Sequence, residues 1–291
     1  MIHIFGASHP AANYLIKILG SKTKIKKYSS KSNNSLDYLP YSKIFDEINN
    51  KDIIISFSNI NLASKIIKKI FLGKKFPNKI IFISSSSIYS KLNTKSIDKD
   101  LYNKFIEGED RVRKIHEKSS EKCQFIILRT TMIWGDNDDK NINQIFKLLF
   151  KYKIFPIITN ANGLRAPIHN KDLAMVINKL LSIDTDGLKF FDVRGKTIIK
   201  YKQMVKLVKG SNKKLKTSLL IRIPFLLIKI LEKILNYFPN NRYTLKVKFI
   251  VGALLRQREN LVYFNNDINK IFSDKKEFNF EQNLKMTYKN K

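Results

Sequence analysis

The chain has 291 residues, 43% of them hydrophobic, which is enough for one large α/β domain with a small additional lobe. A lone cysteine, Cys123, excludes an internal disulfide and lies in an apolar run, and four histidines without a Cys/His cluster predict no metal site. The net charge of +31 is dispersed along the chain, as codon drift toward Lys, Ile and Asn produces, so no specific nucleic-acid partner is expected. The chain opens directly into a strand pattern, which predicts a cytoplasmic protein without a signal peptide.

Strand-like and helix-like segments alternate through the first two-thirds of the chain, which is typical of βαβ units. The predicted strands are residues 2–5, 24–28, 52–57, 79–84, 123–133, 155–158 and 188–193. The predicted helices are residues 10–19, 41–50, 61–71, 99–118, 141–152 and 171–182. We therefore expect a doubly wound parallel α/β sheet in residues 1–160. A smaller C-terminal substrate lobe is expected in residues 161–291, interleaved with the sheet and without a clean linker.

Residues 218–238 form a long apolar stretch whose length approaches that of a membrane span. Four charged residues and a proline argue against a span: Arg222, Pro224, Lys229, Glu232 and Lys233. The sequence predicts an amphipathic helix packed on the sheet domain. A helix lying at a membrane interface stays open as the alternative.

The first predicted strand turns into a helix through residues 6–12, Gly-Ala-Ser-His-Pro-Ala-Ala. A dinucleotide site uses glycines there for the tight turn, for the approach of the pyrophosphate and for helix–strand contact. Only Gly6 is present; His9 and Ala12 hold the second and third glycine positions, and His9 would crowd a pyrophosphate unless the turn is rebuilt. An ordinary strand–turn–helix is the alternative. The cofactor-binding candidates of this region and of the third strand's end are Gly6, Ser8, His9, Ala12, Ser56 and Phe57.

No acidic residue follows the second predicted strand, where one would bind the ribose diol of NAD. Ser29, Ser30 and Lys31 stand there instead and could hold a 2′-phosphate through hydroxyls and a positive charge. The sequence thus predicts NAD or NADP as cofactor, with a weak preference for NADP. The alternative is a lysine-rich loop without a ligand.

A serine cluster ends the fourth predicted strand, in residues 79–89, Lys-Ile-Ile-Phe-Ile-Ser-Ser-Ser-Ser-Ile-Tyr. A short β-branched run of this kind is typical of a buried parallel strand, whose carboxyl end opens into the crevice where such sheets bind ligands. Ser85, Ser86 and Tyr89 are therefore catalytic candidates.

Two later stretches resemble a known family. Residues 126–135 read Ile-Ile-Leu-Arg-Thr-Thr-Met-Ile-Trp-Gly, and residues 163–174 read Gly-Leu-Arg-Ala-Pro-Ile-His-Asn-Lys-Asp-Leu-Ala. With the serine strand, they resemble the extended short-chain dehydrogenase/reductase superfamily, specifically its NAD-dependent epimerase/dehydratase family. There they usually read Leu-Arg-Pro-Thr-x-Ile-Tyr-Gly and Gly-Leu-x-x-Pro-Val-His-Val-x-Asp-Leu-Ala. The resemblance extends over nearly the whole chain, through residues 191–195, 201–205 and 256–262.

The resemblance implies a Rossmann-like fold, an NAD(P) cofactor and a nucleotide-sugar substrate, for a reductase, epimerase or dehydratase of surface polysaccharide biosynthesis. It places Ser85 at the hydroxyl that polarises the sugar, and Thr130 and Thr131 near the nicotinamide. The implied substrate-binding residues are Arg165, His169, Arg256 and Arg258. For His169, packing between the lobes is the alternative, and for the arginines a surface position. A homodimer and a peripheral contact with a membrane surface stay open.

The chain departs from this family at the catalytic helix, where the family has a Tyr-x-x-x-Lys pair whose lysine lowers the pKa of the tyrosine. With residues 106–109 (Ile-Glu-Gly-Glu) registered on the family's Leu-x-Gly-Glu, Leu101 and Phe105 hold the two positions. Tyr102 is an alternative proton carrier if a deletion has shifted the register. The missing pair leaves a second hypothesis open, a non-catalytic dinucleotide-binding protein with a structural or regulatory role.

Overall fold

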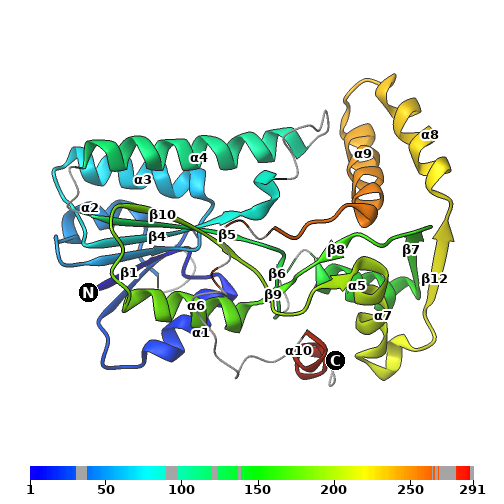
Figure 1. The fold of residues 1–291 in the computed structure, drawn as a ribbon, viewed down its shortest axis with the longest axis horizontal. Coiled ribbons are helices and arrows are strands. Elements are labelled where there is room, and N and C mark those ends of the chain that lie inside the picture. Colours follow the sequence, from blue (N-terminus) through cyan, green and yellow to red (C-terminus); the bar gives the residue numbers. More distant parts are fainter. Residues whose placement is uncertain are drawn as a thin grey trace.

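The structure, a computed structural model, describes residues 1–30, 38–89, 98–119, 123–136, 139, 141–263, 265, 268 and 280–288. Its centre is a six-stranded parallel sheet (Figure 1). In spatial order the strands are β10 (Leu188–Val193), β5 (Gln124–Thr130), β4 (Lys79–Ser85), β3 (Ile53–Ser56), β1 (Ile2–Phe5) and β2 (Ile25–Tyr28). The parallel, doubly wound α/β sheet predicted from the sequence is confirmed.

Helices cover both faces of this sheet, because successive strand side chains alternate between two apolar cores. On one face lie α1 (Pro10–Leu19) and α6 (Asn170–Leu181), packed against strand residues such as Ile4. On the other lie α2 (Ile44–Glu47), α3 (Ile60–Leu72) and α4 (Asp98–Lys118), packed against residues such as Ile54 (Figure 1). The central strands β3, β4 and β5 are therefore mostly apolar on both faces, and serine and threonine residues stand at their carboxyl ends.

The strand order reverses at β1, which pairs with β2 on one side and with β3 on the other. Beyond β2, Leu39 adds a single parallel bridge to Tyr28. Ligands of open parallel sheets bind at the carboxyl ends of the strands flanking such a reversal. The residues that follow β1 and β3 thus border the expected binding crevice.

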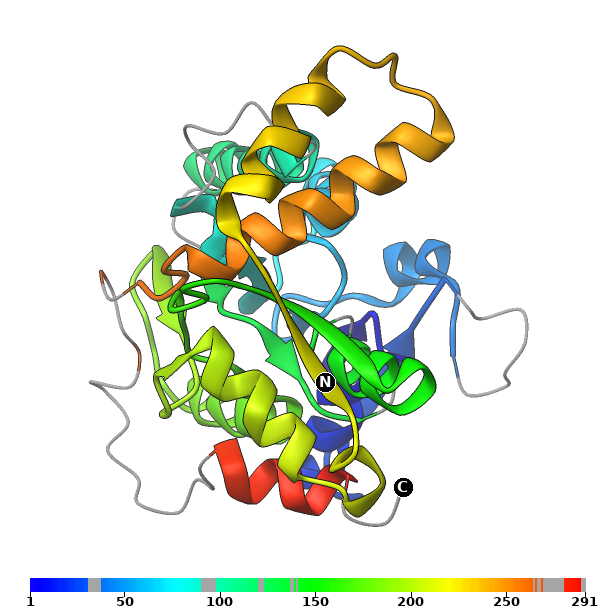
Figure 2. The ribbon, with the colours of Figure 1, turned by 90° about the vertical axis from the view of Figure 1, so that its right-hand side faces the viewer.

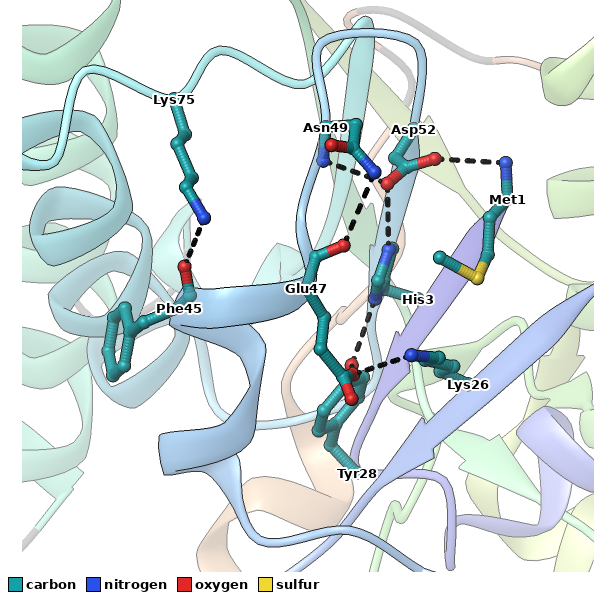
Figure 3. Close-up of polar contacts among 9 residues, drawn as sticks. All are labelled: Met1, His3, Lys26, Tyr28, Phe45, Glu47, Asn49, Asp52 and Lys75. Carbon is teal, nitrogen blue, oxygen red and sulfur yellow. Dashed lines mark hydrogen bonds and ion pairs between the residues drawn. The ribbon is translucent and has the colours of Figure 1, made fainter.

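A buried polar cluster fixes these three strands to one another (Figure 3). His3 of β1 is fully buried, with Nδ1 3.0 Å from the Tyr28 hydroxyl and Nε2 3.1 Å from a carboxylate oxygen of Asp52. The Tyr28 hydroxyl also donates to Glu47 of α2. Burial lowers the pKa of His3, while Asp52 opposes that shift. The cluster holds β1, β2 and β3 in register at the point where the sheet reverses.

The second lobe faces the carboxyl ends of the sheet strands (Figure 1). It contains the parallel pair β7 (Ile154–Ile158) and β12 (Leu219–Ile223) and the two-stranded pairs β6 (Ile133–Trp134) with β9 (Ile168–His169) and β8 (Leu164–Arg165) with β11 (Ile199–Lys200). Its helices are α5 (Ile142–Tyr152), α7 (Tyr201–Gly210), α8 (Phe225–Asn236), α9 (Arg242–Leu255) and α10 (Phe280–Tyr288). Between β9 and β11 the chain returns to the sheet through α6 and β10.

The prediction of one helix over residues 218–238, packed on the sheet domain, is wrong. The segment divides at Pro224 into strand β12 and helix α8. Proline lacks a backbone N–H and disfavours helical backbone in the residue before it, and the β-branched Ile221 and Ile223 suit a strand. Helix α8 packs along α9 rather than on the sheet. Within the described ranges, no helix is both long enough and apolar enough to cross a bilayer.

Two other predicted elements differ in length. The predicted helix over 41–50 is reduced to a 3-10 turn, Tyr41–Lys43, and the one-turn helix α2. The predicted strand over 123–133 ends at Thr130, and Ile133–Trp134 form the separate strand β6. In both cases the apolar pattern extends beyond the hydrogen-bonded segment.

Candidate active site at the carboxyl edge of the sheet

The turn after β1 accepts only glycine at its first position. Gly6 has a φ of +65°, and a Cβ there would lie 2.8 Å from the backbone nitrogen of Ser58. Its N–H donates to the Tyr41 hydroxyl, which lies 2.8 Å from Ser58 Oγ. The turn after β1 is therefore packed against Phe57 and Ser58, which follow the end of β3, across the point where the sheet reverses.

His9 caps the helix that follows this turn. Its Nδ1 accepts the Ala11 N–H at 3.2 Å, and its ring stacks on Phe57 with the centroids 5.6 Å apart. The Ala12 and Asn13 N–H groups donate to the His9 carbonyl, and Pro10 has no N–H. The first-turn amides, which would otherwise face an anion, are thus satisfied within the helix.

The cap also fixes the tautomer of His9. Because Nδ1 accepts, the neutral ring carries its proton on Nε2 and presents a donor there. Burial lowers the pKa of His9, which favours this neutral form. At the second glycine position of the dinucleotide motif, this turn presents the imidazole of His9. Ala12 is buried at the helix–strand contact.

Small hydroxyl residues surround the same turn. The buried Ser29, which follows β2, donates to Ser8 Oγ at 3.3 Å. Ser30 is exposed, and Lys31 lies outside the described residues. At the end of β3 the Ser56 hydroxyl is fully buried and has no hydrogen-bond partner among the described residues. The structure thus brings Ser8 and Ser29 together beside the Gly6 turn.

The serine cluster lies at the carboxyl end of β4, where Ser85 pairs in register with Thr130 of β5. Ser85 Oγ is 2.8 Å from Ser87 Oγ and accepts the Ser87 N–H. The Thr130 and Thr131 hydroxyls donate to the carbonyls of Ser84 and Ala166. Ser85 is half-buried and Ser86 is buried, so the Ser85–Ser87 pair is the more accessible hydroxyl group of this edge.

A buried ion pair lies directly behind these serines. Arg129 of β5 donates from Nε and Nη2 to the two carboxylate oxygens of Glu109 on α4, and Ser84 Oγ also donates to Glu109, at 2.7 Å. Glu109 raises the pKa of Arg129 although burial alone would lower it. The pairing of Arg129 with Glu109 was not predicted from the sequence. The available signals were an arginine inside an apolar strand pattern and an acidic residue in the motif of the predicted helix.

The same network holds Tyr89. Its hydroxyl accepts from Arg129 Nη1 at 2.8 Å and donates to Asp192 at 2.9 Å. Burial raises the pKa of Tyr89, Arg129 opposes that shift and Asp192 adds to it. With both hydrogen-bonding directions in use, Tyr89 has a positioning role in this geometry, and its catalytic role stays a prediction.

The geometry of helix α4 places Tyr102 on the side of the helix that faces the Arg129–Glu109 pair. Gly108 lies so close to α3 that a Cβ would be 2.8 Å from the Asn61 nitrogen, and Phe105, at the family's lysine position, packs into the apolar core. At 100° per residue, Tyr102 lies about 20° around the axis from Glu109. Tyr102 therefore shares the side of α4 that meets Arg129 and Ser84. The exposed Lys104 lies about 140° from Glu109, on the other side of the helix.

Arg165 lies in the second lobe and is almost fully buried. Its guanidinium donates to the carbonyls of Leu164, Arg256 and Glu259, and burial lowers its pKa to about 10. Arg165 thereby fixes the segment that carries Arg256 and Arg258. Arg258 is exposed and stacks over the Phe225 ring at 4.0 Å.

His169 is buried at the start of α6, where Nδ1 accepts the Lys171 N–H. Its ring packs edge-on against Trp134, with the centroids 4.9 Å apart. This geometry corresponds to the packing alternative, although contact with a ligand through Nε2 stays a prediction. His169 and His9 thus cap helices in the same way, each through Nδ1.

The capping role of His169 gives a pH prediction. Burial lowers its pKa from 6.5 to about 4, so between these values the unfolded chain binds a proton that the folded chain excludes. Stability should therefore be full above pH 6.5 and fall as the pH drops toward 4, by up to about 3 kcal/mol from this residue. His169→Asn keeps a helix cap and removes the titration. The free energy of unfolding, measured with urea from pH 7.5 to 4.5, should depend less steeply on pH in this variant than in the unmodified protein. An equal pH dependence in the two proteins would refute the assignment.

Comparison with solved structures shows which proteins share this fold. The UDP-N-acetylglucosamine 4-epimerase from Methanobrevibacter ruminantium M1 matches with a TM-score of 0.65 and 14% identity, over 98% of this chain and 96% of that one. A dTDP-glucose 4,6-dehydratase from Streptomyces venezuelae, solved with NAD bound, matches with a TM-score of 0.68 and 11% identity, over 98% and 95%. No family model and no curated protein matches the sequence. The resemblance stated from the motifs is confirmed for the fold, which is Rossmann-like and extends over nearly the whole chain.

Proposed function

We propose that this protein binds a nicotinamide dinucleotide in the crevice between the carboxyl ends of β1 and β3 and acts on a nucleotide sugar. The observation that carries the proposal is the glycine-only turn at Gly6, placed at the reversal of strand order. Only β3 separates β1 from β4, the strand that ends in the Ser85 hydroxyl pair. The fold-level likeness to NAD-dependent epimerases and dehydratases supports it. A role in surface polysaccharide biosynthesis follows from the sequence resemblance and stays a prediction.

The residues at the turn fit a dinucleotide in an altered form. Gly6 leaves the turn without a side chain, and the neutral His9 imidazole offers Nε2–H at the helix start as a donor to a pyrophosphate oxygen. The Ser8 and Ser29 hydroxyls lie at the side where an adenosine ribose or its phosphate would bind. We therefore assign pyrophosphate recognition to the Nε2–H group of His9, because the first-turn amides of α1 already donate to His9.

The chemistry then depends on hydroxyl groups of this chain. A bound nicotinamide supplies the hydride acceptor or donor. Ser85 Oγ hydrogen-bonds the reacting sugar oxygen, and its contact with Ser87 Oγ gives the proton a path along the edge of the sheet. Tyr102, on the Glu109 side of α4, is our choice of proton carrier. The Arg129–Glu109 pair holds β4, β5 and α4 together behind these groups.

Substrate binding is assigned to the second lobe. Arg165 fixes the backbone of residues 256–259 by three hydrogen bonds to carbonyls of this segment and its own strand. Arg256 and Arg258 are thereby held on a rigid support, from which guanidinium groups bind a diphosphate in bidentate fashion. Their role stays a prediction of this proposal.

Titration of the protein with NAD(H) and NADP(H) tests the cofactor assignment. The absent acid after β2, together with Ser29, Ser30 and Lys31, predicts tighter binding of NADP(H), by roughly 1–3 kcal/mol. Ser30→Asp places a carboxylate at this exposed position, where it can accept from the ribose diol of NAD(H), and should reverse the preference for NADP(H). Equal or NAD-favouring affinities of the unmodified protein would overturn the preference. No binding of either dinucleotide at millimolar concentration would overturn the proposal.

A further inference from the structure

Exposed apolar side chains gather on one part of the second lobe, strand β12 with helices α8 and α9. Figures 1 and 2 show α8 and α9 as a hairpin that projects from the rest of the molecule. Of the 23 large hydrophobic side chains exposed in the described ranges, 14 lie within residues 219–250. They are Leu219, Ile221, Leu226, Leu227, Ile230, Leu231, Ile234, Tyr237, Phe238, Tyr243, Leu245, Val247, Phe249 and Ile250. A patch so concentrated marks a contact surface.

The end of the hairpin is aromatic. Tyr237, Phe238 and Tyr243, at the connection between α8 and α9, are 89%, 54% and 77% exposed. Along α8 itself only Ile228 is buried, although the helix packs against α9. Aromatic rings of this kind are enriched where a protein meets the headgroup region of a bilayer.

The hairpin is also strongly basic. Residues 219–252 contain a single acidic residue, Glu232, which pairs with Lys229 at 3.0 Å. Six basic residues accompany it: Arg222, Lys229, Lys233, Arg242, Lys246 and Lys248. At the base of the hairpin, Arg222 joins Lys202 and Lys206 around a cavity of about 370 Å³. The apolar surface therefore carries a positive field over its whole length.

We propose that the α8–α9 hairpin docks this protein on the surface of a membrane that contains anionic lipids. Apolar and aromatic side chains enter the headgroup boundary, while lysines and arginines reach the lipid phosphates. A second copy of the chain fits less well, because pairing two hairpins would bring twelve basic and two acidic side chains together in an apolar contact. The hairpin lies on the membrane and does not cross it, since neither helix is long and apolar enough to span.

Flotation with vesicles tests this proposal on the full-length protein. Binding to vesicles of 30% phosphatidylglycerol in phosphatidylcholine is expected, with little binding to phosphatidylcholine alone and loss at high salt. The triple variant Tyr237→Ser, Phe238→Ser, Tyr243→Ser should lower the vesicle partition coefficient at least about tenfold. Lys233→Gln with Lys246→Gln should lower it roughly tenfold or more.

Matched control variants distinguish binding through the hairpin from non-specific apolar or electrostatic binding to vesicles. Leu62→Ser with Leu72→Ser removes exposed apolar residues of α3, and Lys17→Gln with Lys22→Gln removes exposed charge near α1. Both controls should bind vesicles as the unmodified protein does. The proposal is overturned if they lose as much binding as the hairpin variants, or if the unmodified protein does not float with anionic vesicles. If the protein does not bind vesicles but self-associates through Tyr237 and Phe238, the hairpin would instead be a contact surface for a second copy of the chain.

A fluorescence measurement locates the contact. The chain has one tryptophan, Trp134, which is fully buried, so a tryptophan introduced at an exposed position reports its own surroundings. Tyr237→Trp should show a blue-shifted emission on addition of anionic vesicles, and Leu72→Trp, at a similarly exposed site, should not. An unshifted Tyr237→Trp emission in the presence of bound vesicles would place the membrane contact elsewhere.

Discussion

Turnover of a nucleotide sugar is expected to fall by roughly 10²-fold in Ser85→Ala, and by roughly 10²–10⁴-fold in Tyr102→Phe. Ser85 offers the accessible hydroxyl at the end of β4, and a positioned donor at a reacting oxygen contributes at this level. Tyr102 shares the Glu109 side of α4, about 20° around the helix axis from it. The family register alone would have made Tyr102→Phe mild; the helix geometry makes it severe.

Steady-state kinetics with UDP- and dTDP-sugars measure both variants. Tyr152→Phe, an exposed tyrosine on α5, is the matched control and should leave turnover unchanged. Dinucleotide affinity should barely change in any of the three proteins, since these groups are assigned to the sugar. Normal turnover in both Ser85→Ala and Tyr102→Phe would remove the proposed proton path. A protein that binds dinucleotide and turns over no nucleotide sugar would favour the non-catalytic hypothesis.

Arg129→Ala should destabilise the fold by about 3–5 kcal/mol, because it leaves the Glu109 carboxylate buried without its partner. The Glu109 side chain is 2% exposed and receives two hydrogen bonds from Arg129. The change also removes the donor to the Tyr89 hydroxyl. Denaturant unfolding at neutral pH measures the loss.

Two further variants make this prediction specific. Glu109→Gln combined with Arg129→Met removes both charges and should recover much of the lost stability, since the cost of Arg129→Ala comes from an unpaired buried charge. Lys229→Ala breaks the exposed pair with Glu232 and should cost at most about 1 kcal/mol. Equal losses in Arg129→Ala and Lys229→Ala would show that the buried pair has no special role.

The sheet could be predicted from the sequence because its strands are buried on both faces. The strands Ile53–Ser56 and Lys79–Ser85 each contain an uninterrupted apolar run followed by hydroxyl residues, which indicates both a parallel strand and its carboxyl end. The segment over residues 218–238 could not be assigned in the same way. Ile228 packs into a small core of the second lobe, but most large apolar side chains of the segment are exposed. An apolar pattern that normally marks burial therefore marks, for most of this segment, an exposed surface.

Individual residues of the candidate site could be predicted from the sequence, but the hydrogen bonds that position them could not. Gly6 and Ser85 are local signals, each tied to a strand end. The role of His9 depends on its ring folding back onto the Ala11 N–H, and that of Arg165 on three carbonyls, two of them more than ninety residues away. The Arg165 contacts are set by tertiary structure and leave no trace in residue spacing. The His9 contact is local, but the residue types alone do not show that the ring turns back onto the helix.

The central claim, that a dinucleotide binds at the turn after β1, is tested most directly by calorimetric titration of Gly6→Ala against Gly20→Ala. Both glycines have a positive φ, +65° and +68°, so alanine introduces backbone strain at either position. At Gly6 the new Cβ would also meet Ser58 at 2.8 Å, whereas at Gly20 nothing lies within 4 Å. We predict that the unmodified protein and Gly20→Ala bind NAD(P)H alike, and that Gly6→Ala binds roughly tenfold more weakly or worse. Equal affinities of the two variants, or no binding by the unmodified protein, would contradict the account.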